Sequence, residues 1–139
     1  GPETAATLKT FLDGLHSKGV AVNLDPANLV MVTGDDPVKA VYTLKDYIVH
    51  THAKDGVKLK ASNPEFIYRV VHPIPPEYAE GGFFKEMPLG SGAVPFPAYL
   101  AALEDIGYRG FLTVERECGD RPEKDIQTAV EYLNKVIRG

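Results

Sequence analysis

The sequence has 139 residues, a length that fits one domain with a buried core. Hydrophobic residues make up 44% and charged residues 24% of it, as in ordinary globular proteins, and a net charge of -4 gives no support to nucleic-acid binding. No apolar run approaches the roughly 18 residues that span a bilayer, and the single cysteine, Cys118, excludes an intrachain disulfide and fits a reducing, cytoplasmic location.

The first predicted elements are a helix over residues 3–18 and a short strand over residues 20–24. The helix is indicated by an apolar stripe at helical spacing, with Gly19 as the residue after its last turn: Leu8, Phe11, Leu12 and Leu15. The strand is apolar without clean alternation, which is typical of a strand covered on both faces. Asp25 follows it directly.

Asp25 allows two interpretations. Asp25-Pro26 is a common way to begin a turn, and on this pair alone the turn is favoured. A carboxylate oxygen in this place is also a suitable ligand for a divalent metal ion.

A second helix over residues 37–45 and a second strand over residues 47–52 come next. The helix begins with the carboxylate cap Asp36 and with a proline at its first position. The strand is rich in β-branched and aromatic residues. His50 and His52 are two positions apart in it, so both side chains face the same side of the sheet.

The residues at the end of this strand predict a site. His52 is the better candidate for a metal ligand, and His50 for a pocket residue, although a lone strand histidine is more often a hydrogen-bonded core residue. Lys54 is a candidate for holding an anionic or oxyanion group of a substrate. The alternative for Lys54 is a surface lysine that pairs with Asp55.

Residues 56–92 break the pattern with five prolines and several glycines. A connection of this length is usually functional or disordered. Its aromatic residues argue against disorder, and residues 67–71 form a candidate short strand within it. The Gly90-Ser91-Gly92 stretch lacks the lysine and helix of a phosphate loop, but its backbone amides are candidates for contacting a substrate anion.

The chain ends with a helix over residues 97–106, a strand over residues 111–115 and a helix that begins at Pro122. Strands that alternate with helices predict a parallel sheet with right-handed crossovers. In a parallel barrel the C-terminal ends of the strands meet on one face. The strand-end residues Asp25, His52 and Glu115 are therefore expected to converge.

Four stretches taken in order resemble the xylose isomerase-like TIM-barrel superfamily, the sugar phosphate isomerases and epimerases that also include endonuclease IV. They are VNLDPAN at 22–28, HTHAKD at 50–55, PLGSG at 88–92 and GYRGFLTVERE at 107–117. The resemblance runs along the whole chain. It implies an α/β fold that is part of a (β/α)8 TIM barrel, comprising its last three strands with their helices.

The resemblance also implies a divalent metal ion (Mn, Mg, Co or Zn) held by Glu, Asp, His and Glu from four consecutive strand ends. Asp25, His52 and Glu115 match three of these ligands. The first Glu has no counterpart. In similar sequences it stands in a Glu-Thr-Gly-x-Glu-Thr stretch, and this chain begins with residues 1–4, Gly-Pro-Glu-Thr.

We therefore expect residues 1–139 to be the C-terminal half of a longer barrel, with 1–2 as native sequence and 56–92 as a long loop insertion on the active-site side. A TIM barrel needs about 250 residues and eight strands. Three strands alone would leave open edges, which promote association. The expected partners are another copy of the chain or the missing N-terminal half.

The function expected from the resemblance is metal-dependent isomerisation or epimerisation of a sugar or sugar phosphate, through α-proton abstraction and an enediolate. Glu115 is the candidate acid or base, Lys54 and His50 would orient the substrate, and Asn28 and Gly90 are further substrate-binding candidates. Endonuclease IV has a histidine where this chain has Asn28, which counts against DNA repair. The alternatives are a lyase or dehydratase of a cyclic polyol or keto acid, and a half-barrel without activity.

Overall fold

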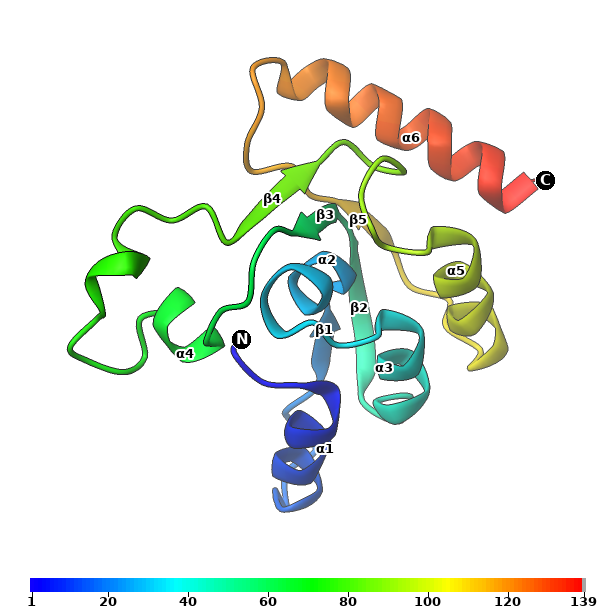
Figure 1. Cartoon of the computed structure of the whole chain (residues 1–139). Helices are drawn as coiled ribbons and strands as arrows, with labels where there is room; N and C mark the ends of the chain where they lie inside the picture. The colour runs from blue at the N-terminus through cyan, green and yellow to red at the C-terminus, as the bar shows by residue number, and fades with distance from the viewer. Residues whose placement is uncertain (139) are drawn as a thin grey trace.

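A parallel sheet of three strands lies at the centre of the computed structural model, which describes residues 1–138 (Figure 1). Its strands are β1 (Val22–Leu24), β2 (Ile48–Ala53) and β5 (Leu112–Val114), with β2 in the middle. Both neighbouring pairs run parallel. The predicted alternation of strands and helices in a parallel sheet is confirmed.

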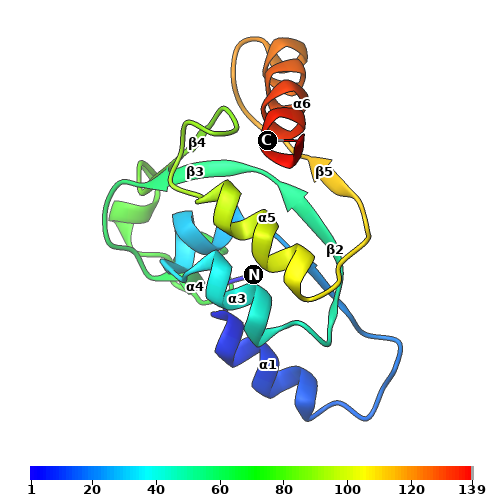
Figure 2. The same cartoon turned by 90° about the vertical axis from the view of Figure 1, so that its right-hand side faces the viewer.

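Four helices form a row along the sheet, as Figure 2 shows: α1 (Ala5–Asp13), α3 (Pro37–Thr43), α5 (Phe96–Asp105) and α6 (Pro122–Arg138). Each helix contacts the next one in this order, and α6 also contacts β5. The core is made of apolar side chains that these helices and the sheet bury together, among them Leu24, Val41, Leu44, Ala53, Phe96 and Tyr99. Burial of this apolar surface is the main force that holds the helices on the sheet.

One buried polar contact ties the central strand to its neighbours. The Thr51 hydroxyl donates to the Leu24 carbonyl oxygen at 2.8 Å, and its oxygen lies 2.5 Å from the Tyr99 hydroxyl. Burial raises the pKa of Tyr99, so the phenol stays protonated and can donate to Thr51. Both polar groups are satisfied without water, as buried polar groups require.

Several predicted elements are shorter than the sequence indicated, α3 and β5 among them, and the causes are clearest in α1 and β1. Helix α1 ends at Asp13 instead of residue 18, with Gly14 as its C-cap. Phe11 in its apolar stripe is 60% exposed, so the described residues provide little packing surface to extend the helix. Strand β1 begins at Val22 instead of residue 20, because Val20 lies exposed outside the parallel ladder.

The segment 56–92 contains more regular structure than predicted. Strand β3 (Asp55–Lys58) follows β2 almost directly and pairs antiparallel with β4 (Phe84–Met87) in a separate two-stranded sheet. Between them lie helix α4 (Pro64–Ile67) and a 3-10 turn at Pro76–Tyr78.

The strand predicted over residues 67–71 is wrong. Ile67 ends α4, and Arg69 has a φ of 55°, in the left-handed region that interrupts a strand. The predicted role of the aromatic residues is confirmed in part, because Tyr78 stacks on Phe83 with ring centres 4.4 Å apart and Phe66 packs beside it at 5.1 Å.

The loop after β1 is also helical, through α2 (Pro26–Asn28) and a π-helical turn at Leu29–Thr33 that contact β3. In the described residues, β1 and β5 each pair with one neighbour only, so the parallel sheet is open at both edges. No helix within residues 1–138 is both long and apolar enough to cross a membrane.

Candidate active site

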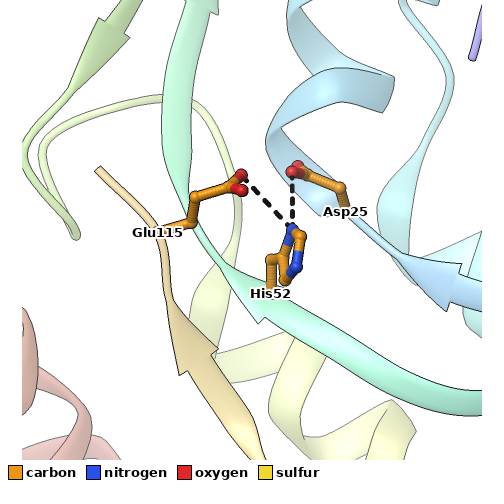
Figure 3. A group of neighbouring side chains, drawn as sticks. All are labelled: Asp25, His52 and Glu115. Atoms are coloured by element: carbon orange, nitrogen blue, oxygen red, sulfur yellow. Dashed lines mark hydrogen bonds and ion pairs between the residues drawn. The ribbon is translucent and has the colours of Figure 1, made fainter. Parts of the chain in front are cut away.

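Asp25, His52 and Glu115 meet at the C-terminal ends of the three parallel strands (Figure 3). The Nδ1 atom of His52 lies 3.2 Å from Oδ2 of Asp25 and 3.3 Å from Oε2 of Glu115. One donor atom from each residue falls within 4.8 Å of the other two. The predicted convergence of these three side chains is what the structure shows.

Asp25 combines the two interpretations that its sequence left open. Oδ1 accepts the backbone N–H of Asn28 at 2.9 Å and so caps α2, while Oδ2 faces His52. Burial raises the pKa of Asp25, although the Asn28 amide and His52 act in the opposite direction. The turn therefore holds the carboxylate in a fixed orientation, with Oδ2 directed at His52.

Glu115 follows β5, where its backbone N–H donates to the Ala53 carbonyl oxygen at 3.2 Å and keeps it beside the end of β2. Its Oε2 accepts a hydrogen bond from Nζ of Lys54 at 3.0 Å. Burial disfavours the charged carboxylate, but the Lys54 contact outweighs this effect and holds the pKa of Glu115 below its ordinary value. Glu115 is therefore ionised at neutral pH.

Lys54 is held by a set of carboxylates. Besides Glu115, its ammonium pairs with Glu117 and lies 3.5 Å from Oε2 of Glu86 on β4. The side chain is only 2% exposed. Burial acts to lower the pKa of Lys54, but the hydrogen bonds that Lys54 donates to Glu117 and Glu115 outweigh it and raise this pKa. The alternative of a surface lysine paired with Asp55 is wrong, because Lys54 is buried and its partners are glutamates.

Glu86 also fixes the backbone that follows Glu115. Its Oε1 accepts from Nη1 of Arg116 at 2.7 Å, and from the backbone N–H groups of Glu117 at 3.0 Å and Cys118 at 3.4 Å. Arg116 in turn donates through Nε to Asp125 on α6 at 2.7 Å. This connection ties β4, the end of β5 and α6 together behind the site.

A cleft of about 290 Å³ opens above the three side chains. Its lining includes the convergent residues and, beside them, Asn23, Asn28, Lys54 and Glu117. The donor set of one imidazole nitrogen and two carboxylate oxygens suits Mg, Mn, Co or Zn. Their spacing and their shared orientation into the cleft fit a divalent cation held by these three residues.

Comparison with known proteins identifies the family. The chain matches the family described as xylose isomerase-like TIM barrel over residues 1–136. The chain belongs to this family. It is also similar to the crystal structure of a xylose isomerase domain protein from Planctomyces limnophilus, with a TM-score of 0.76 and 32% identity. That match covers 98% of this chain and 44% of the other chain. A search of curated proteins gives no significant match.

Membership of the family explains the open sheet. The strands β1, β2 and β5 form part of a TIM barrel, and their helices form the matching part of its outer ring. The side of the sheet that carries His52 corresponds to the barrel interior. Active sites in this fold lie at the C-terminal ends of the strands, where Asp25, His52 and Glu115 meet.

Two predicted site residues, Gly90 and His50, have contacts other than those predicted for them. The backbone N–H of Gly90 donates to Oδ2 of Asp55 at 3.0 Å, so this amide is not available to a substrate anion. Gly90 is also not among the residues that line the cleft. Asp55 accepts three further backbone N–H groups, from Gly56, Gly92 and Val94, and thereby shapes the loop before α5.

His50 shares the face of His52, as predicted, with ring centres 6.0 Å apart. Its Nε2 is bonded to Oγ1 of Thr113 at 2.8 Å. His50 is not among the residues that line the cleft, which favours a role in the layer beneath the site over direct contact with substrate.

Sequence reasoning missed Asn23, Glu86 and the second role of Glu117. Asn23 carries a usable signal, because it lies within the predicted strand, two positions before Asp25. Glu86 offers none, since its position depends on the pairing of β3 with β4 in a stretch without a clear pattern. Glu117 is mostly exposed, and its carboxylate also pairs with the buried Lys54.

Proposed function

We propose that this chain carries the metal-binding part of a divalent-metal-dependent isomerase or epimerase that acts on a ketose, a sugar phosphate or a related polyol. The observation that carries the proposal is the convergence of Asp25, His52 and Glu115, within 4.8 Å of one another, at three adjacent strand ends. Membership of a family that includes sugar isomerases and epimerases supports it.

The proposed chemistry is removal of a proton from the carbon next to a sugar carbonyl. Asp25, His52 and Glu115 would hold a divalent cation, which would supply the Lewis acidity that polarises this carbonyl. Glu115 accepts the proton as a carboxylate, and its delivery to the former carbonyl carbon, with transfer of the hydroxyl proton to the other oxygen, completes isomerisation. Epimerisation requires a second acid that protonates the original carbon from the opposite face. Because the Lys54 contact holds the pKa of Glu115 low, Glu115 is ionised at neutral pH, which is the form that a base requires.

The other residues of the cleft position these groups. Lys54 makes its ionic contacts with carboxylates, so its proposed role is to orient Glu115 and to balance the negative charge of the cleft. Asn28 lines the cleft and stays a candidate for binding substrate hydroxyl groups. A cytoplasmic location remains a prediction from the single cysteine.

The test of the chemistry uses the step that isomerase, epimerase and dehydratase share. The chain is incubated in D2O with Mn2+ and a panel of ketoses and sugar phosphates, and NMR follows deuterium incorporation at the carbon beside the carbonyl. We expect exchange that EDTA abolishes and that Glu115→Gln lowers by at least 10²-fold. Glu80→Gln, an exposed residue outside the cleft, is the matched control.

Exchange that continues in EDTA, or that Glu115→Gln leaves at the wild-type rate, contradicts the proposal. Identification of the product then distinguishes an isomer or epimer from the dehydrated product of a lyase. The lyase is a second candidate because it begins with the same proton abstraction.

We also propose that the open edges of the sheet are covered in the working protein. Strands β1 and β5 each lack a partner on one side, and Phe111 beside β5 is 81% exposed. A second copy of the chain or an N-terminal barrel half would pair with these edges and contribute further residues to the cleft. Light scattering together with intact mass tests self-association, and a stable monomer of 15.2 kDa would contradict it.

A further inference from the structure

The polar side chains on the inner face of the sheet are paired diagonally. In the strand register, Asn23 lies opposite His50, and His52 lies opposite Thr113. The hydrogen bonds follow the diagonals instead. Asn23 Nδ2 lies 3.1 Å from Nε2 of His52, and Thr113 Oγ1 lies 2.8 Å from Nε2 of His50. Each histidine therefore has a neutral partner that can both donate and accept.

The two nitrogens of His52 face opposite kinds of group. Nδ1 lies within 3.3 Å of two carboxylate oxygens, an arrangement in which Nδ1 carries the proton. Nε2 then accepts from the amide of Asn23. To bind a metal ion through Nδ1, the neutral ring must carry its proton on Nε2 instead. The group opposite Nε2 must then accept a hydrogen bond.

We propose that Asn23 is a positioning residue that lets His52 change tautomer when a metal ion binds. Rotation of the Asn23 amide exchanges its Nδ2 donor for its Oδ1 acceptor without moving the strand. In the metal-bound state Oδ1 would accept the Nε2–H of His52 and hold the ring with Nδ1 directed into the cleft. This inference rests on the metal site of the proposed function.

The structure makes this proposal specific to Asn23. Its side chain lines the cleft and is exposed, so a substitution there disturbs the buried core little. An aspartate in its place keeps an acceptor for Nε2–H, whereas a leucine of similar size provides none. Outer partners of metal-bound histidines typically contribute 10–100-fold to metal affinity.

The experiment measures Zn2+ affinity by calorimetry and the ring protons of His52 by 15N NMR. In the wild-type chain we expect the proton on Nδ1 without metal, and an Nε2–H signal when Zn2+ is bound. Asn23→Leu should lower Zn2+ affinity by about 10–100-fold and remove the Nε2–H signal, while Asn23→Asp restores both. Thr113→Val, which removes the partner of His50, is the matched control and should leave Zn2+ affinity within about threefold of wild type.

Wild-type Zn2+ affinity in Asn23→Leu, with affinity lost in His52→Ala, overturns this inference alone. A loss in Asn23→Asp as large as that in Asn23→Leu overturns it as well. Zn2+ binding that is unchanged in His52→Ala overturns the proposed metal site, and this inference with it.

Discussion

Two groups of carboxylates in this chain have opposite surroundings. In the site cluster, Asp25 and Glu115 turn oxygens toward the same atom of His52, beside an open cleft. In the anchor pair, Asp55 and Glu86 are almost completely buried, and backbone N–H groups or Arg116 occupy their oxygens.

The anchor pair stabilises the fold, whereas the site cluster is arranged to bind a cation. The anchor pair accepts hydrogen bonds that would otherwise be lost on burial, so it should contribute strongly to folding. In the site cluster, burial raises the pKa of Asp25, so its charge opposes folding and favours binding of a cation, whereas Lys54 stabilises the charge of Glu115. Substitutions in the two groups should therefore affect different properties.

The largest expected effect is on stability, from Asp55→Ala. The four backbone N–H groups that Asp55 now accepts would lose their common partner inside the protein. We expect a loss of about 3–5 kcal/mol in the free energy of unfolding, measured by urea denaturation. Asp120→Ala, in an exposed loop, should change it by less than about 0.5 kcal/mol. A loss below about 1 kcal/mol in Asp55→Ala would show that the anchor is not structural.

The next effect is the dependence of stability on pH through Glu86. Burial alone would raise the pKa of Glu86, but Arg116 and the backbone N–H of Glu117 outweigh it and leave this pKa below 4.5. A lowered folded-state pKa contributes stability above the unfolded-state pKa, and this stability is lost as the pH falls through the folded-state pKa.

Urea denaturation from neutral pH to below 4.5 checks this effect. Wild type should lose about 1–3 kcal/mol more stability over this range than Glu86→Gln, because the glutamine does not titrate. Equal losses in the two proteins would mean that Glu86 is not a source of the acid sensitivity.

The smallest effect on stability is expected from Asp25→Asn. The asparagine keeps an oxygen to cap α2. Burial raises the pKa of Asp25 in the folded protein. At a pH above the ordinary pKa of an aspartate, the charge on Asp25 therefore lowers the stability of the fold. The free energy of unfolding at neutral pH should stay within about 0.5 kcal/mol of wild type or increase. A loss above about 1 kcal/mol would place Asp25 with the anchor pair instead.

The strand-end site could be predicted because its signals are local in the sequence. Asp25, His52 and Glu115 each end an apolar run, and the parallel sheet then brings the runs together. The alternation of strands and helices likewise predicted the central sheet. Helix ends were less predictable, since the end of α1 depends on which side chains find a packing partner.

The partners of the site residues could not be predicted, because they come from distant parts of the chain. Lys54 stands next to Asp55 in the sequence but pairs with glutamates from two other segments. Asp55 and Gly90 are 35 positions apart and meet only because β3 pairs with β4. No periodicity in residues 56–92 signals that pairing.

The measurement that tests the central claim most directly is a Mn2+ titration followed by electron paramagnetic resonance. Wild type and Glu80→Gln, a change at an exposed residue outside the cleft, should each bind one Mn2+ per chain. His52→Ala should abolish this binding while the protein stays folded, as judged by circular dichroism. Absence of binding in wild type, or the same binding in His52→Ala, would contradict a metal site formed by Asp25, His52 and Glu115.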